Sequence, residues 1–373
     1  MANAPRHSER AGVRGLVERL DGVFGSRRLG RELALLQRTF DAVPDGWMVL
    51  GDSGAVATEN DAARRLLGMV RGDHRTLVEV ARDPAVDSLI AGEVEDGIVE
   101  IASPIDESTR LELRHIRADG GQSIVLVRDV TTLNRLLTMR QDFIANVSHE
   151  LRTPLTVIVG YLEALEDDDI DLDTMRRLLN RLHAPAERMK ALVDDLLTLT
   201  RLESSPMPGP DDVEVVNVAA MVDSIVAEAR QLAGPEHEFH IAVDSDLCVA
   251  GVPTELHSAC FNLVANAIRY SPDGGPIHVR WQASDSGPRF EVEDAGQGIA
   301  AEHLSRLTER FFRVDLADSR ARGGTGLGLA IVKHVLRRHN SELRVASEVG
   351  EGSVFHFVLP AISTSETGAA PPA

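Results

Sequence analysis

The sequence predicts a multidomain α+β protein in which a long helical hairpin lies between two mixed α/β segments. Apolar residues recur at steps of three and four from Leu136 to Leu165, which is the period of one buried helix face, and a second helical stripe runs from Met175 to Leu199. On both sides of these stretches, short runs with strand character alternate with helical runs and turn residues. The 373 residues are enough for two to four domains, each with its own core.

Composition excludes several classes of protein. The formal charge of −19 argues against a surface that binds nucleic acid directly. The longest apolar runs fall far short of the ~20 residues that span a bilayer, so we expect neither a transmembrane helix nor a signal peptide. Two cysteines, Cys248 and Cys260, cannot form a disulfide framework, which is typical of a reducing compartment. We therefore expect a cytoplasmic protein with at most a peripheral contact to the inner face of the membrane.

Residues 1–32 are expected to form a separate N-terminal segment. They carry seven arginines against four acidic residues, and glycines interrupt their short apolar stripe. A peripheral membrane contact is one interpretation. We favour a frayed, flexible segment.

Residues 33–130 are predicted to form a small α/β domain. Strands are expected at 47–50, 55–58, 97–102, 110–116 and 123–127, with a tight turn at 51–54 and a short helix at 60–67. The strings FDAVPDGWMVL, ENDAARRLLG and RDVTTLNRL in this segment resemble a PAS sensor domain. Whether such a domain binds a small molecule stays open, and we favour a protein–protein or dimerisation module with a filled core.

The hairpin is expected to span residues 131–204, with a linker rich in Ser, Pro and Gly at 205–212. Two antiparallel helices with one apolar face each cannot bury both faces alone. Pairing with a second copy gives a four-helix bundle, which is the simplest solution. The pattern therefore predicts a homodimer with one copy of the bundle helices from each chain.

His149 in the first hairpin helix is a candidate functional residue. It lies two residues from both Val147 and Leu151, so the helical period turns its side chain away from the apolar face. A lone exposed histidine is usually a solvated surface residue, but the surrounding string FIANVSHELRTPL resembles the phosphoacceptor box of bacterial sensor histidine kinases. That resemblance implies that His149 receives a phosphoryl group. We expect Glu150 to accept a proton from the imidazole, and the resemblance implies that Thr153 orients a water that removes phosphate from a partner's aspartate.

Four separated pieces of the C-terminal segment are candidates for a nucleotide site. Asn262 and Asn266 are four residues apart on one helix face, and their amide oxygens suit a hard cation such as Mg²⁺. Arg269 is placed to meet phosphate oxygens, and Tyr270 offers a flat face to a base or sugar. Asp294 follows a predicted strand at 289–293, where a carboxylate can accept the exocyclic amine of adenine.

The glycines in these pieces allow a close approach of the backbone to a ligand. Gly296 and Gly298 follow Asp294. The third piece, at 309–313, has no glycine and ends at Arg313. A further run precedes a predicted helix, where backbone N–H groups can bind phosphate; its residues are Gly324, Thr325, Gly326, Leu327 and Gly328. Residues 314–322 are expected to form a mobile lid. No GK[ST] tripeptide occurs, so a Walker-type phosphate loop is excluded.

In this order, the four pieces resemble the N, G1, F and G2 boxes of the histidine-kinase ATP-binding domain. The resemblance implies an α/β-sandwich ATPase domain at 213–361, followed by a disordered tail at 362–373. ATP and Mg²⁺ are the implied cofactors. Asn262 and Asn266 are the expected metal ligands, and the other residues named in the four pieces are expected to bind the nucleotide.

Within this family, the strings MRQDFIANVSHELRTPLTVIVGYLEAL and RFFRVDLADSRARGGTGLGLAIVKHVL look most like phosphate-regulon sensor kinases. Those kinases normally carry membrane-spanning helices, which this sequence does not show. The resemblance implies autophosphorylation, transfer to the aspartate of a response-regulator receiver domain, phosphatase activity on it, and signalling of phosphate limitation. A phosphate signal would then arrive through an accessory protein of phosphate uptake that contacts residues 33–129.

Two alternatives accompany this interpretation. The same kinase could respond to another stimulus, or the chain could be a non-catalytic dimeric scaffold that binds ATP. The intact His149, Glu150, Asn266 and Asp294 argue against the scaffold, because a degenerate protein has no reason to keep them together.

Overall fold

The structure, a computed structural model, describes residues 38–51, 53–71, 73, 75–117, 122–166, 170–314 and 324–361. The chain divides into two compact units, Met1–Asp142 and Phe143–Ala373. The predicted N-terminal segment, all but the first residue of the predicted lid, and the C-terminal tail lie outside the described residues.

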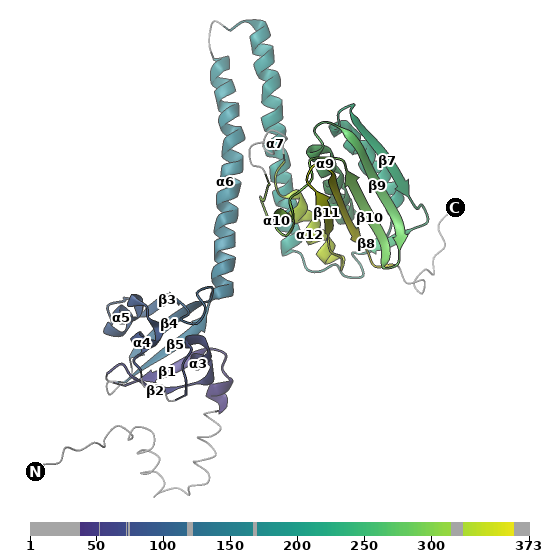
Figure 1. The fold of residues 1–373 in the computed structure, drawn as a ribbon. Coiled ribbons are helices and arrows are strands. Elements are labelled where there is room, and N and C mark those ends of the chain that lie inside the picture. Colours follow the sequence, from purple (N-terminus) through teal and green to yellow (C-terminus); the bar gives the residue numbers. More distant parts are fainter. Residues whose placement is uncertain are drawn as a thin grey trace, which may run out of the picture. The chain divides into compact units, whose positions relative to one another are not determined.

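The first unit is built on a five-stranded antiparallel sheet with strand order β2-β1-β5-β4-β3 (Figure 1). Its elements are β1 Gly46–Leu50, β2 Val56–Glu59, α3 Asp61–Leu67, α4 Leu77–Ala81, α5 Pro84–Ala91, β3 Ile98–Ala102, β4 Arg110–Arg117 and β5 Ser123–Asp129. All five predicted strands and the predicted helix are confirmed to within two residues at each end. The short helices α4 and α5 were not predicted individually.

One buried side chain explains why the start of this unit folds as it does. Asn60 is fully buried and caps α3 by accepting a hydrogen bond from the Ala63 N–H at 2.9 Å. It also accepts from the Trp47 N–H at 3.0 Å and donates to the Asp45 carbonyl at 3.0 Å and the Phe40 carbonyl at 3.2 Å. Asn60 therefore fastens α3, β1 and the segment before β1 to one another with every polar group satisfied.

Two long helices form the hairpin, as the apolar period predicted. Helix α6 spans Thr131–Leu165 and α7 spans Leu172–Ser204. The carboxylate of Asp171 caps α7 by accepting hydrogen bonds from the N–H groups of Asp173 and Thr174. None of the helices in the described parts of the chain combines the length and the apolar content that a membrane span requires.

The rest of the second unit is an α/β sandwich, with sheet order β11-β12-β10-β9-β7 and a parallel pairing only between β7 and β9 (Figure 1). A small second sheet pairs β6 with β8. The elements are β6 Glu214–Asn217, α8 Val218–Leu232, β7 His237–Val243, β8 Cys248–Gly251, α9 Pro253–Tyr270, β9 Gly275–Ser284, β10 Gly287–Asp294, α10 Ala301–Leu304, α12 Gly328–Arg338, β11 Arg344–Glu348 and β12 Gly352–Val358.

The core of this sandwich includes part of the hairpin. The large side chains Trp281, Phe290 and Phe357 of the sheet are fully buried against α8, α9 and α12. Three leucines of α7, Leu192, Leu199 and Leu202, belong to the same buried cluster. The C-terminal half of α7 is therefore fixed on the sandwich by apolar burial, and it brings its polar side chains to the edge of the site described next.

Candidate functional site

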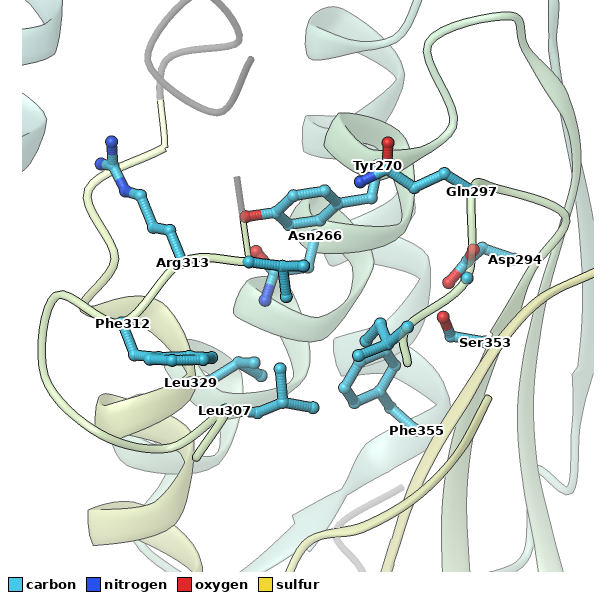
Figure 2. A pocket seen from close by; sticks show the side chains of 13 residues that line it. Asn266, Tyr270, Asp294, Gln297, Leu307, Phe312, Arg313, Leu329, Ser353 and Phe355 are labelled. Atoms are coloured by element: carbon cyan, nitrogen blue, oxygen red, sulfur yellow. The ribbon is translucent and has the colours of Figure 1, made fainter. Parts of the chain in front are cut away.

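A pocket of about 630 Å³, including the solvent at its mouth, opens between α9, the end of β10 and residues 312–314 (Figure 2). It is lined by Asn266, Tyr270, Asp294, Gln297, Gly298, Ile299, Leu307, Phe312, Arg313, Val314, Leu329, Ser353 and Phe355. The fold thus brings residues from three of the four predicted pieces into one cavity. The fourth piece adjoins it through Leu329, in the first turn of α12.

A buried carboxylate stands beside an apolar floor in this pocket. Asp294 is 6% exposed and accepts a hydrogen bond from the Gly296 N–H at 2.9 Å. Burial raises the pKa of Asp294 to about 6, although hydrogen bonds from the backbone of Gly296 and Ser353 oppose the shift. The floor is formed by Leu307, Phe312, Leu329 and Phe355 (Figure 2). A flat heteroaromatic base with an exocyclic amine fits an apolar floor with one acceptor at its edge.

The glycines after Asp294 are required by the close packing of the backbone. Gly298 has φ +66°, and a Cβ there would overlap the carbonyl oxygen of Glu348. The Gln297 N–H donates to the Tyr270 carbonyl at 3.2 Å and so ties this turn to the end of α9. No residue with a side chain can replace Gly298 without moving β11.

Two amide side chains on α9 offer oxygen atoms, Asn266 in the pocket and Asn262 one turn before it. Asn266 is 8% exposed, and its Oδ1 accepts a hydrogen bond from Arg269 Nη1 at 2.9 Å. Asn262 Nδ2 donates to the Ser258 carbonyl at 2.8 Å, and its Oδ1 faces Gly328, where a Cβ would lie 2.5 Å from that oxygen. The Asn262 oxygen therefore lies near the start of α12, and the Asn266 oxygen lies beside Arg269. Such amide oxygens suit Mg²⁺.

The glycine run before α12 is hydrogen-bonded to Phe311 and Arg313. The Phe311 N–H donates to the Gly326 carbonyl at 2.8 Å, and the Arg313 guanidinium donates to the Gly324 carbonyl. Thr325 accepts a hydrogen bond from the Leu327 N–H at 3.3 Å. These bonds place the run beside residues 311–313 and directly before the first turn of α12, whose N–H groups can bind an anion.

The predicted phosphoacceptor lies on α6 with its side chain exposed. The neighbouring Glu150 is largely buried and forms ion pairs with Arg188 of α7 at 3.1 Å and with Arg313 at 3.5 Å. Thr153 donates its hydroxyl proton to the His149 carbonyl at 3.2 Å, one turn back along the helix. Arg313 thus contacts the histidine helix, the glycine run and the pocket at once.

Sequence reasoning did not identify several residues of this region. Arg188 and Asp195 lie beside Met189 and Leu196 of the apolar stripe on α7, and no local motif distinguishes them from solvated helix charges. Only the packing of α7 on the sandwich brings them to the site. Gln297 lay inside a predicted motif without being singled out.

Two family models match the chain in the order that this geometry implies. Residues 139–205 match the His Kinase A (phospho-acceptor) domain, and residues 251–363 match the histidine kinase-, DNA gyrase B-, and HSP90-like ATPase. Over 346 residues the chain is 41% identical to the phosphate regulon sensor protein PhoR of Pseudomonas aeruginosa, covering 91% of this chain and 77% of that protein. The chain belongs to the sensor histidine kinases.

Other sensor kinases match over about two thirds of the chain. The sensor-like histidine kinase SenX3 of Mycobacterium tuberculosis is 40% identical over 246 residues, which are 64% of this chain and 58% of SenX3. PhoR of Haemophilus influenzae is 36% identical over 237 residues, which are 64% of this chain and 55% of that protein. The histidine kinase ThkA, solved in complex with the response regulator protein TrrA, is 19% identical, with a TM-score of 0.48, over 85% of this chain and 96% of that one. As a sensor histidine kinase, the chain is an ATP-dependent protein kinase of a two-component system.

Proposed function

We propose that this kinase transfers the γ-phosphoryl group of ATP to His149 and then to an aspartate of a response-regulator receiver domain, in the signalling of phosphate limitation. The observation that carries the proposal is the position of Arg313. It lines the pocket and also pairs with Glu150, the residue next to His149. The pocket and the phosphoacceptor helix are therefore connected by a single side chain.

The pocket offers a matching partner to each part of the substrate. Asp294 accepts the adenine amine, the apolar floor covers the ring, and Tyr270 lies against the base or sugar. The glycine run, with Arg269 and Arg313, faces the phosphates. Asn262 and Asn266 would hold Mg²⁺, which neutralises phosphate charge when bound.

The transfer itself needs an imidazole with one lone pair available. The unprotonated ring nitrogen of His149 attacks the γ-phosphorus, a P–N bond forms, and the bond to the bridging oxygen breaks so that ADP leaves with the electron pair. The other ring nitrogen carries the proton, and it becomes acidic as positive charge builds on the ring. Glu150 takes that proton, which leaves neutral phosphohistidine. Arg313 offsets negative charge on the phosphoryl oxygens.

Thr153 is proposed to serve the reverse task, the removal of phosphate from the receiver domain. It lies four residues after His149 on α6, so the two side chains share one helix face. Its hydroxyl, which donates to the His149 carbonyl in this structure, is exposed and can bind a water. A water so placed can attack an aspartyl phosphate that docks against this face.

A homodimer is proposed from the apolar surface of the hairpin. More than half of the large apolar side chains that are exposed in the described residues lie on α6 and α7. They include Leu136, Leu155 and Leu162 of α6 and Leu179 and Leu197 of α7, each at least 47% exposed. Burial against a second copy as a four-helix bundle removes this surface from water.

The first unit is proposed to be a PAS-like sensor domain, with boundaries 33–130. Its antiparallel five-stranded sheet with three short helices supports this assignment. We propose that it acts through protein contacts, and that an accessory protein of phosphate uptake brings the signal to it at the cytoplasmic face of the membrane. The hairpin at 131–204, the linker at 205–212 and the ATPase domain at 213–361 complete the proposed organisation.

The assignment to phosphate signalling is supported by the name and the 41% identity of the P. aeruginosa relative. The test is phosphotransfer from the labelled kinase to purified receiver domains of the source organism. We expect one receiver, encoded near this kinase and required for growth at low phosphate, to take the label within seconds, and its aspartate-to-asparagine variant to take none. Transfer confined to a receiver without a role at low phosphate would support the other-stimulus alternative.

A further inference from the structure

The carboxylate of Glu150 lies between two guanidinium groups that come from different parts of the second unit. Arg188 Nη2 of α7 lies 3.1 Å from Glu150 Oε2, and Arg313 Nη2 lies 3.5 Å from the same oxygen. The side chains of Glu150, Arg188 and Arg313 are only 13%, 19% and 2% exposed. An ion pair this far from water fixes its members in place, because separating them leaves a buried charge without its partner.

Arg313 contacts the glycine run and the pocket as well as Glu150. It donates to the Gly324 carbonyl and lines the nucleotide pocket, so bound phosphates compete with Glu150 for its guanidinium. Arg188 does not line the pocket, and it sits in the middle of α7, the hairpin partner of α6. Arg188 can therefore hold Glu150 whether or not Arg313 turns to the phosphates.

The charges around Glu150 favour this division of roles. Burial lowers the pKa of the Arg269 guanidinium, the charge of Asp195 raises it, and the charge of Arg188 lowers it, so all three groups lie within electrostatic reach of one another. Arg188 therefore belongs to a cluster of mixed charge with Arg269 and Asp195, in which it pairs with Glu150 at 3.1 Å.

We propose that Arg188 is a positioning residue for phosphoryl transfer. It holds Oε2 of Glu150 so that the carboxylate stays oriented to take the imidazole proton of His149. The inference rests on the roles proposed above for His149 and Glu150. The same contact could instead be a lock that restrains the kinase. The two differ in sign, because loss of a positioning contact lowers the transfer rate and loss of a lock raises it.

The first test is autophosphorylation of the full-length kinase with γ-labelled ATP. Arg188→Gln removes the charge at similar length, and we expect kcat to fall about ten- to a hundredfold with KM for ATP changed less than about twofold. Arg188→Lys keeps the charge but not the planar fork, and it should recover part of the loss. The matched control is Arg177→Gln on the same helix, where the guanidinium contacts only the nearby Thr174 among the contacts described, and this variant should behave like the wild type.

The second test asks whether Arg188 acts through Glu150. In a Glu150→Gln background, Arg188→Gln should cost less than about twofold in kcat, since the group that it positions is already gone. An equal loss in both backgrounds, or a rise in kcat, would overturn the inference. If Arg188→Gln does not fold, Arg188→Lys in the same two backgrounds decides the question in the same way. If the wild type is labelled on His149 and Arg188→Gln autophosphorylates at the wild-type rate, this inference alone is rejected. If the wild type is labelled on another residue, the proposed function is rejected.

Discussion

The hydroxyl of Thr325 in the glycine run donates a hydrogen bond of 2.6 Å to the carboxylate of Asp195 on α7. The two residues are 130 positions apart in the sequence, and the contact joins the phosphate-binding end of the pocket to the hairpin. Burial raises the pKa of Asp195, while the Thr325 hydroxyl and the charge of Arg269 lower it. The position of the glycine run therefore depends on a polar contact with a helix outside the sandwich.

Thr325→Val removes that hydroxyl at nearly constant shape. We expect a loss of about 1 kcal/mol in the free energy of unfolding, because the half-buried Asp195 carboxylate loses a partner. Urea denaturation measures it, with Thr325→Ser as the control that keeps the hydroxyl. Equal stability of the valine and serine variants would show that the contact contributes nothing.

ATP binding should weaken in acid because of Asp294. Its pKa of about 6, raised by burial from the ordinary 3.8, means that the carboxyl is ionised at pH 7 and largely protonated at pH 5. The protonated form cannot accept the adenine amine in the same way, so affinity should fall about tenfold from pH 7 to pH 5. Calorimetry at several pH values measures it.

The control for this pH dependence is Asp294→Asn, which should bind weakly and lack the additional dependence, since the nucleotide's own ionisation is common to both proteins. The effect of Asp294 on folding stability depends on pH in the opposite direction to that of a carboxylate whose pKa is lowered on folding. Because the folded pKa is raised, the contribution of Asp294 to stability is largest at low pH and is lost as pH rises from about 4 to about 6. An identical pH profile for the wild type and the asparagine variant would contradict the assignment.

Asn266→Ala should lower the affinity for ATP in the presence of Mg²⁺ by at least about tenfold, because an amide oxygen of the proposed metal site is lost. Without Mg²⁺ the wild type and the variant should differ much less. Gln231→Ala, on the exposed surface of α8, is the matched control. If the affinity of the variant falls equally with and without Mg²⁺, Asn266 contacts the nucleotide and not the metal.

Removing residues 1–129 deletes the first unit up to the end of β5. We expect a dimeric, ATP-dependent kinase that no longer responds to its stimulus, because the apolar faces of α6 and α7 remain and the proposed sensor is gone. Light scattering and autophosphorylation test the two halves of this expectation. A monomer would contradict the bundle, and a response that survives would place the sensor elsewhere.

Local patterns were enough to predict most of the fold. The apolar period from Leu136 to Leu165 predicted α6 from its second turn to its last residue, because a helix with one apolar face has a strong periodic signal. The five strands of the first unit were predicted from β-branched runs between turn residues. Helices α4 and α5 were missed individually, since they have 5 and 8 residues, too few for a clear period.

Some residues of the site could be predicted from short stretches of sequence, and others depend on contacts between distant parts of the chain. Asn266, Asp294 and Gly298 could be predicted because each lies in a short string whose chemistry is local. The partners of Glu150 could not, because Arg188 lies 38 residues away on another helix and Arg313 belongs to another domain of the same unit. Such contacts depend on how α7 packs on the sandwich, which is a property of the whole core.

The identity of the phosphorylated residue tests the account most directly. Full-length kinase is incubated with γ-labelled ATP, and the label is mapped by mass spectrometry and by its stability in acid and base. We predict an acid-labile, base-stable phosphoryl group on His149, lost in His149→Gln while ATP affinity stays at the wild-type value. A label that persists in His149→Gln, or a variant that no longer binds ATP, would contradict the separation of the phosphoacceptor from the nucleotide site.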